Sequence, residues 1–300
     1  MSGALLEIRK RIGSVRNTRK ITKAMQLMAA TKMRQFQKRA VSTREYVWEL
    51  MGLLEGNLSV PTSYTEQREG GKILFVLYTS DKGLCGPLNN KLINTLFRSE
   101  EWNNTPAEQR LLITLGKKGY DFARSRSIPV LKHYTGVPEK MTALEAIKIT
   151  DTILNEWKTG EVKQVIFAAP FYKNSITFYP VVKTFLPFSK EMIVSNIGPD
   201  EHARRHHGSA HAQDRQTIYE PSLERVTERL QEQVVISLFM GAFLELKASE
   251  YSSRMLAMQN ATDSADKVIN ELSRQYNKAR QQAITAEIAE LVGASDAISA

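Results

Sequence analysis

The stretch ASEYSSRMLAMQNATDSADKVINELSRQYNKARQQA, residues 248–283, carries small or apolar side chains at steps that alternate strictly between three and four residues. The mean step is about 3.5 residues, which is the repeat of a supercoiled helix pair and not the 3.6 of a straight helix. Many of these side chains are small, so a second helix can approach closely. We therefore expect a coiled-coil helix over residues 218–295. Its inward positions are Leu223, Val226, Leu230, Val234, Ser237, Gly241, Leu244, Ala248, Tyr251, Met255, Met258, Thr262, Ala265, Ile269, Leu272, Tyr276, Ala279 and Ala283.

The placement of proline shows where such long helices can exist. All ten prolines lie between Pro61 and Pro221, which leaves 60 residues before them and 79 after them. Because proline breaks helix interiors but is tolerated in a first turn, both flanks are expected to be helical, the second with Pro221 in its first turn. In residues 1–60 the polar Arg19 and Thr22 interrupt the apolar stripe, so this helix needs a partner. The two flanks are expected to pair antiparallel as a rod of roughly 100 Å. The stripe is Ile8, Ile12, Val15, Ile21, Met25, Met28, Val47, Leu50 and Leu54.

Residues 70–199 follow a different pattern, in which short β-rich apolar runs alternate with helical stretches. The alternation predicts a central α/β (Rossmann-like) domain with a parallel or mixed sheet. The tetrapeptide YKNS at 172–175 is predicted to form a hairpin turn. Residues 200–217 are polar and His-rich, and are expected to form a loop. Strands are expected at 72–80, 111–116, 162–171 and 175–186, and helices at 88–100, 117–126 and 143–157.

The net charge of +9 comes from one end of the chain. Residues 1–50 hold 12 basic and 3 acidic side chains, whereas the other 250 residues hold 29 of each sign. This basic arm leaves three interpretations open: a nucleic-acid-binding segment, a membrane-surface helix, or a solvated helix with a partner on one side. The single cysteine, Cys85, excludes an internal disulfide framework. No apolar run is long enough for a transmembrane helix and no secretory signal is visible, so we expect a soluble protein.

The candidate chemical sites are few. The segment YTSDKGLCGPLNN follows the first strand, where phosphate sites occur, but it has no glycine pattern for phosphate, and Pro87 removes an amide that a phosphate would need. A structural turn or a protein contact is therefore favoured there. Cys85 is expected to be a packed thiol and not a nucleophile. No cofactor and no metal are expected, although His202, His206, His207 and His211 have spacings that a metal site could use.

Three blocks carry a specific resemblance: IRKRIGSVRNTRKITKAMQLMAATKMRQFQKRA (8–40), SDKGLCGPLN (80–89) and ASEYSSRMLAMQNATDSADKVINELSRQYNKARQQAITAEIAELVGA (248–294). They closely resemble the gamma subunit of the F-type ATP synthase. The resemblance implies a rotor that stands inside a ring of three alpha and three beta subunits and contacts the epsilon subunit and the membrane c-ring. It also implies that the chain has no active site of its own, binds no nucleic acid, is not inserted in the membrane, and lies on the cytoplasmic side of a bacterial plasma membrane.

The same resemblance assigns contact residues by position. Met25 is similar to the rotor residue that faces the acidic lever of beta, with packing inside the coiled coil as the alternative. Arg254, Arg280, Gln281 and Thr285 are similar to the contacts with the beta catch loop, for which a solvated helix face is the alternative. A foot region near epsilon and the membrane ring is assigned to Asp81, Gly83, Leu84, Cys85 and Gly86.

Two positions depart from the family pattern, and one alternative function stays open. The family usually has glycine where this chain has Pro87, and glutamine where it has Ala286, which puts the loop geometry and one upper contact in question. The alternative is a coiled-coil protein that binds nucleic acid through residues 1–50, with binding that weakens as salt increases. An enzyme that uses the α/β domain is a third, weaker option.

Overall fold

The computed structural model describes residues 3–192 and 219–299. Contacts divide the chain into two compact units: a coiled-coil unit of residues 1–30 with 254–300, and a domain unit of residues 31–253. Two long helices, α1 (Gly3–Glu55) and α8 (Leu223–Ser299), contribute to both units. Together with a central mixed sheet, they confirm the predicted fold class.

In the coiled-coil unit, α1 and α8 pair along the predicted seam of α8. Met258, Thr262 and Ala265 are buried, while the seam positions from Ile269 to Ala283 are half-buried between exposed neighbours. Thr262 of α8 contacts Thr22 of α1, and the later Asp266 contacts the earlier Arg19. Residue numbers therefore increase along one helix as they decrease along the other. The pairing is therefore antiparallel, as predicted.

The inward face of α1 differs from the predicted stripe at two positions. Ile21 and Met28 are 61% exposed, whereas Thr22 and Ala29 take the buried positions. Thr22 interrupts the apolar stripe of the sequence but still lies inside the helix pair, where its hydroxyl is 2.8 Å from that of Thr262. A polar residue can occupy a seam position when it meets a polar partner there.

The domain unit contains a five-stranded sheet in the order β3-β2-β1-β4-β5. The strands are β1 (Lys72–Tyr78), β2 (Arg110–Leu115), β3 (Lys132–Tyr134), β4 (Val162–Tyr172) and β5 (Phe178–Leu186). All neighbours are parallel except β4 and β5, whose antiparallel pairing follows the predicted hairpin. The strand β3 was not predicted from the sequence, because this three-residue edge strand has two exposed side chains and no apolar run.

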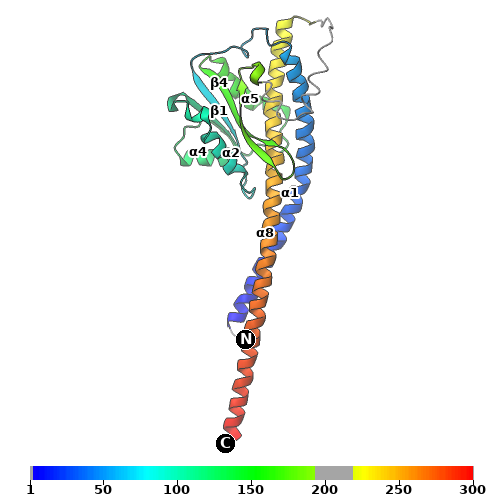
Figure 1. The fold of residues 1–300 in the computed structure, drawn as a ribbon, viewed down its shortest axis with the longest axis vertical. Helices are drawn as coiled ribbons and strands as arrows, with labels where there is room; N and C mark the ends of the chain where they lie inside the picture. The colour runs from blue at the N-terminus through cyan, green and yellow to red at the C-terminus, as the bar shows by residue number, and fades with distance from the viewer. Residues whose placement is uncertain (1–2, 193–218, 300) are drawn as a thin grey trace. The chain divides into compact units, whose positions relative to one another are not determined.

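Helices cover both faces of the sheet (Figure 1). The first crossovers place α2 (Leu88–Phe97) and α4 (Lys117–Ser125) on one face, while α5 (Ala143–Lys158) lies on the other. Between α2 and β2 lie the short α3 (Glu100–Asn103) and a 3-10 turn, η1 (Ala107–Gln109). At the start of α5 the Thr142 side chain accepts from the Glu145 amide, and the Glu145 side chain accepts from the Thr142 amide. This capping box fixes where the helix begins.

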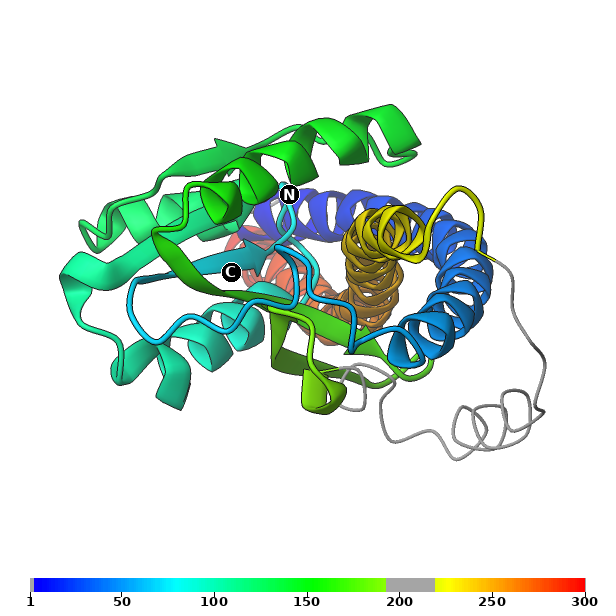
Figure 2. The ribbon, with the colours of Figure 1, turned by 90° about the horizontal axis from the view of Figure 1, so that it is seen from above.

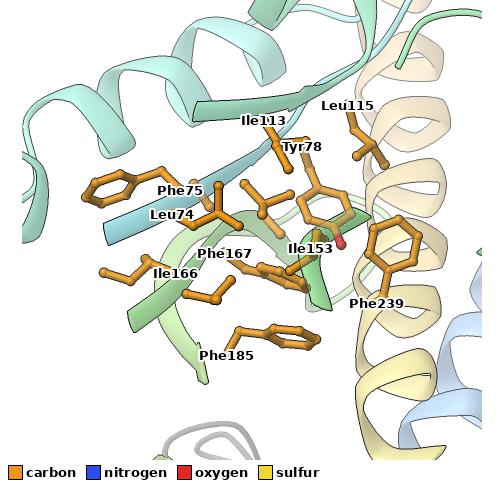
Figure 3. Packing of buried hydrophobic residues seen from close by; sticks show 14 of the residues in the cluster. Leu74, Phe75, Tyr78, Ile113, Leu115, Ile153, Ile166, Phe167, Phe185 and Phe239 are labelled. Atoms are coloured by element: carbon orange, nitrogen blue, oxygen red, sulfur yellow. The ribbon is translucent and has the colours of Figure 1, made fainter. Parts of the chain in front are cut away.

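A second apolar face of α8 fills the core of the domain unit, and the sequence analysis did not predict it. Val235, Phe239, Phe243 and Leu246 are buried, at helical spacings that the seam does not use. The Phe239 ring lies 5.7 Å from Tyr78 and 6.3 Å from Phe167, and Figure 3 shows it turned toward both. Within this unit α8 therefore packs on the sheet with one face and on α1 with another (Figure 2).

The start of α8 lies slightly beyond the predicted one. Pro221 is not in the first turn, because the helix begins at Leu223. Ser222 caps it instead: its Oγ accepts from the Arg225 amide at 3.4 Å and its carbonyl accepts from the Val226 amide at 3.1 Å. Glu224 in the first turn suits the positive helix terminus, as expected. The predicted loop of residues 200–217 lies outside the described residues.

Candidate functional site

The predicted contact residues of the coiled-coil unit differ in accessibility. Met25 is half-buried against the partner helix, which is consistent with the packing alternative. Arg254 is 9% exposed. Arg280, Gln281 and Thr285 are exposed, and the Thr285 hydroxyl donates to the Gln281 carbonyl at 2.9 Å. Of the five predicted residues, only Arg280, Gln281 and Thr285 are therefore exposed.

The end of α8 carries an apolar stripe that the sequence analysis did not single out. Ile284, Ile288, Leu291 and Val292 are 47%, 56%, 71% and 55% exposed. Their spacing of four, three and one residues places them on one face of the helix. No side chain described between Ile284 and Val292 is buried. The signal was present as an apolar repeat beyond the last seam residue, Ala283.

Exposed basic side chains lie along the same part of α1 as two exposed apolar side chains. Ile21 and Met28 are each 61% exposed. The exposed basic residues of α1 in this unit are Arg9, Lys10, Arg11, Arg16, Lys20 and Lys23. The coiled-coil unit therefore offers apolar side chains within a positive field, which suits an acidic protein partner with an apolar lining.

The loop after β1 is held by a buried polar network. The Asn89 side chain accepts from the Ser80 amide at 2.9 Å and donates to the Ser80 hydroxyl at 2.8 Å and to the Cys85 sulfur at 3.3 Å. Cys85 is buried, in agreement with the packing interpretation. Leu84 adopts a φ of 61° and is 64% exposed, so this rigid loop presents one large apolar side chain outward.

The loop and the β4–β5 hairpin both contact α8 where it leaves the domain unit. Ser253 Oγ donates to the Cys85 carbonyl at 2.6 Å, and Ser252 Oγ donates to the Ser175 carbonyl. The opposite end of the unit contains the segment after α1, where the Tyr64 carbonyl accepts from the Phe188 amide at 2.8 Å. The predicted foot residues therefore lie at the end of the unit that continues into the coiled-coil unit along the chain.

The amides that a phosphate would need are already bonded. At the start of α4 the Lys117 amide donates to Asp81 at 2.9 Å, and the Gly119 amide donates to the Thr79 hydroxyl at 2.9 Å. Pro87 precedes α2 and supplies only its carbonyl, which accepts from the Lys91 amide at 2.9 Å, so proline fits this position. These contacts agree with a structural loop.

A buried ion pair fastens the two long helices to the sheet. Arg44 of α1 donates to Glu245 of α8 at 2.9 Å and to the Tyr172 carbonyl at 2.8 Å, while Glu245 accepts from the Tyr172 amide at 3.0 Å. Burial raises the pKa of Glu245, and the neighbouring Arg44 partly offsets this effect. Burial also lowers the pKa of Lys183 nearby. The adjoining cleft of about 90 Å³ is far smaller than ordinary small-molecule sites.

The described part of the chain gives no sign of a metal site. Residues 3–192 and 219–299 contain no group of three or more His, Cys, Asp or Glu side chains that could hold an ion. His202, His206, His207 and His211 lie outside the described residues. Within the same ranges no helix is sufficiently long and apolar to cross a bilayer.

The comparisons with known proteins agree with this arrangement. A family model described as ATP synthase matches residues 4–298. The ATP synthase gamma chain of Chlorobium luteolum is 34% identical over 302 residues, which cover 98% of this chain and 98% of that one. This chain belongs to the ATP synthase gamma chain family. The gamma chain of Staphylococcus saprophyticus is 32% identical and covers 99% of both chains.

Chains in solved structures of ATP synthases share the fold. A chain of the central stalk and c-ring of the Tetrahymena thermophila mitochondrial ATP synthase is 26% identical, with a TM-score of 0.58 over 80% of this chain and 99% of that one. A chain of the Euglena gracilis mitochondrial ATP synthase is 18% identical, with a TM-score of 0.67 over 99% of this chain and 95% of that one. The gamma-chain family thus accounts for the long terminal helices and the central domain together.

Proposed function

We propose that this chain is the central rotor of an F-type ATP synthase. It couples proton flow through the membrane ring to ATP synthesis or hydrolysis in the beta subunits, and it carries no active site of its own. Its partners are three alpha and three beta subunits, the epsilon subunit and the c-ring. Residues 1–60 and 218–295 form the shaft in this proposal, and residues 70–199 form the domain beside it.

The exposed apolar stripe at the end of α8 carries this proposal. Ile284, Ile288, Leu291 and Val292 lie on one helix face without any described side chain over them. Large apolar side chains gathered on a helix tip mark a contact with another protein. An enclosing ring of alpha and beta subunits supplies such a cover without a fixed bond, so the helix can turn inside it.

The shaft acts as a cam because its faces differ. One side of α1 presents basic residues, while the end of α8 presents apolar ones. Each orientation therefore makes a different set of contacts with three otherwise equivalent beta subunits, and differential contact energy selects a different conformation in each. Exposed ion pairs are individually weak, so the contacts can exchange as the shaft rotates.

The contact residues fall into two groups in this proposal. Arg280, Gln281 and Thr285 are exposed and form the contacts with the beta catch loop. Arg254 is 9% exposed and offers a partner much less surface. Met25 faces the acidic lever of beta with its exposed part while its remainder packs in the helix pair.

The foot region needs a test that separates two surfaces. The resemblance assigns Asp81, Gly83, Leu84, Cys85 and Gly86 to the neighbourhood of epsilon and the c-ring. The contact of Ser253 with Cys85 instead supports a position at the end of the domain unit from which α8 continues along the shaft. In that position the loop would face beta. A Leu84→Cys variant, cross-linked in the assembled complex, should bond to beta if the loop faces the shaft end. Cross-links to epsilon or the c-ring alone would restore the first assignment.

The complex that contains gamma chains is membrane-associated, and we place this chain at its periphery on the cytoplasmic side of a bacterial plasma membrane. Neither the described structure nor the comparisons supports the nucleic-acid alternative. In agreement with this, Arg19 of the basic arm is paired with Asp266 at 2.5 Å.

Reconstitution tests the function directly. Mixed with alpha and beta subunits, the chain should form a complex with one copy among three alpha–beta pairs and confer cooperative ATPase activity. A chain ending at Ala283 should fold but assemble less tightly, because it lacks the apolar stripe. Absence of any complex at low and high salt would contradict the rotor proposal.

A paired substitution tests the catch-loop contact. Arg280→Ala with Gln281→Ala should lower coupled turnover by about tenfold, the effect of removing roughly 1.4 kcal/mol of contact energy, while the fold stays intact. The matched control is Arg274→Ala with Gln275→Ala, which removes the same two exposed side-chain types six residues earlier. Equal losses in both variants would reject the site assignment.

A further inference from the structure

One carboxylate bridges both long helices to the α/β domain. Glu139 lies in the loop between β3 and α5. Its Oε2 accepts from Lys32 Nζ of α1 at 2.5 Å, and its Oε1 accepts from the Tyr251 hydroxyl of α8. All three residues belong to the domain unit. A single side chain thus holds two helices with separate oxygens.

The two partners of Glu139 are themselves fixed in place. The Tyr251 ring stacks on Phe36 with centroids 5.6 Å apart and planes at 9°. Lys32 Nζ lies 5.3 Å from the centre of the Tyr251 ring. One turn earlier on α8, Lys247 and Glu250 form a buried ion pair at 3.1 Å. The Glu139 carboxylate therefore meets preorganised donors, which strengthens directional bonds.

The loop that carries Glu139 is anchored at its far end. Met141 is 8% exposed, and Thr142 caps α5 through the capping box with Glu145. Before the loop, the Tyr134 hydroxyl lies 2.7 Å from that of Thr152 in α5. A force on Glu139 is consequently passed to α5 and the sheet, and is not absorbed by a slack loop.

The position of the bridge matters for rotation. Lys32 and Tyr251 lie within two residues of the points where α1 and α8 leave the domain unit. The Arg44–Glu245–Tyr172 contact fastens the same helices again, 12 residues away along α1, which is roughly 18 Å of helix. Apolar packing between these points is non-directional and resists twisting poorly, whereas two separated polar attachments resist both twist and tilt.

We propose that Glu139 is a positioning residue that fixes the rotational angle of the two shaft helices relative to the α/β domain and transmits torque between them. The proposal rests on the rotor function above. The domain receives torque from the membrane ring, and the shaft delivers it to beta. Loss of the bridge makes the connection between the α/β domain and the shaft helices more flexible. Under load the domain then twists relative to the shaft, and less of the torque is transmitted.

The experiment uses the whole enzyme in proteoliposomes. Glu139→Ala removes both bonds, Tyr251→Phe removes one hydroxyl, and Glu161→Gln is the control, since it breaks the Lys72–Glu161 ion pair of the domain without touching either helix. ATP hydrolysis without a proton gradient and protons pumped per ATP against a gradient are measured together. The angular fluctuation of a probe on the domain, with the ring of alpha and beta fixed, reports torsional stiffness.

We expect hydrolysis within about twofold of the wild type in all variants, while Glu139→Ala widens the angular fluctuation about twofold because the attachment that holds both long helices to the loop between β3 and α5 is lost. Pumping per ATP should fall under load in Glu139→Ala, fall less in Tyr251→Phe, and stay unchanged in Glu161→Gln. An unchanged fluctuation width in Glu139→Ala would overturn the proposal. So would an equal fall of hydrolysis and pumping together with a lower unfolding temperature, since that marks a purely structural role.

The result separates the bridge from the rotor function. If Glu139→Ala fails to assemble, the Tyr251→Phe variant tests the proposal instead. An unchanged width of angular fluctuation in Tyr251→Phe counts against the bridge, and a wider fluctuation supports it. Failure of the unmodified chain to assemble with alpha and beta contradicts the proposed function and not the bridge alone.

Discussion

At the scale of single residues, the buried hydroxyl pair of Thr22 and Thr262 is a polar contact inside an apolar seam. One hydroxyl donates to the other, and the accepting one donates to a carbonyl of its own helix, which lies 3.0 Å away for Thr22 (Arg19) and 2.8 Å away for Thr262 (Met258). Either residue changed to valine alone should lower the free energy of unfolding by about 1 kcal/mol, because the hydrogen bond between the two buried hydroxyls is lost. Urea unfolding of the full chain measures this.

The double variant is the decisive member of this series. With both hydroxyls replaced by methyl groups of similar size, the pair becomes apolar, and the loss should be clearly smaller than the sum of the two single losses. Strict additivity would mean that the two hydroxyls do not interact in solution.

Glu139 contributes to the pH dependence of stability. Burial alone would raise the pKa of Glu139, but the bonds from Lys32 and Tyr251 outweigh it and lower the pKa below 4.5. A lowered folded-state pKa contributes stability that is present above the unfolded value and is lost as the pH falls through the folded one. The difference in unfolding midpoint between wild type and Glu139→Gln should thus be full at pH 7 and shrink below about pH 4.5. A difference that grows on acidification would contradict the assignment.

At the scale of the element, the turn from β2 into α4 requires glycine. Gly116 has a φ of 89°, and a Cβ there would lie 2.1 Å from the Thr79 carbonyl oxygen. Gly116→Ala should therefore cost more than about 3 kcal/mol, since backbone strain and a backbone clash add. The matched control is Gly136→Ala, where φ is 69° but no heavy atom lies within 4 Å. This change should cost only about 1–2 kcal/mol. Comparable midpoints in thermal unfolding would contradict the argument.

Periodicity in the sequence predicted some of the helices and strands and missed others. The seam of α8 was predictable because each position repeats at the coiled-coil step, and the buried Met258 and Ala265 confirm it. The second face of α8, with Phe239 and Phe243, was missed because the seam explained the helix without it. The short β3 was missed because Lys132 and His133 are exposed at a sheet edge and leave no apolar pattern.

At the scale of the whole molecule, the rotor proposal requires α1 and α8 to turn as one body. Thr22→Cys with Thr262→Cys places two thiols where hydroxyl oxygens lie 2.8 Å apart, within reach of a disulfide of about 2.05 Å. The natural Cys85 is buried and should not interfere. Oxidation should leave the ATPase activity of the assembled complex within about twofold, because the bond joins parts that do not slide on each other. A loss of activity that reductant reverses would show that the helices must move relative to each other.

The candidate site could be predicted only in part, because the accessibility of its residues depends on the whole fold. Arg280, Gln281 and Thr285 were assigned a contact role from their block of sequence, and their exposure leaves that role open to test. Arg254 came from the same kind of argument, yet it is buried, because accessibility depends on neighbours that no local pattern specifies. The Glu139 bridge joins residues 107 and 112 positions apart, and nothing in the local sequence marks it.

The sequence by itself determined the long helices, their antiparallel pairing and the alternating α/β segment, because periodicity and the absence of proline act locally along the chain. Only the tertiary structure decided which polar residues meet: Thr22 with Thr262, Arg44 with Glu245, and Glu139 with Lys32 and Tyr251. These contacts depend on the rotation of each helix about its axis and on loop paths. Both are fixed by the packing of the whole fold and not by the composition of any one segment.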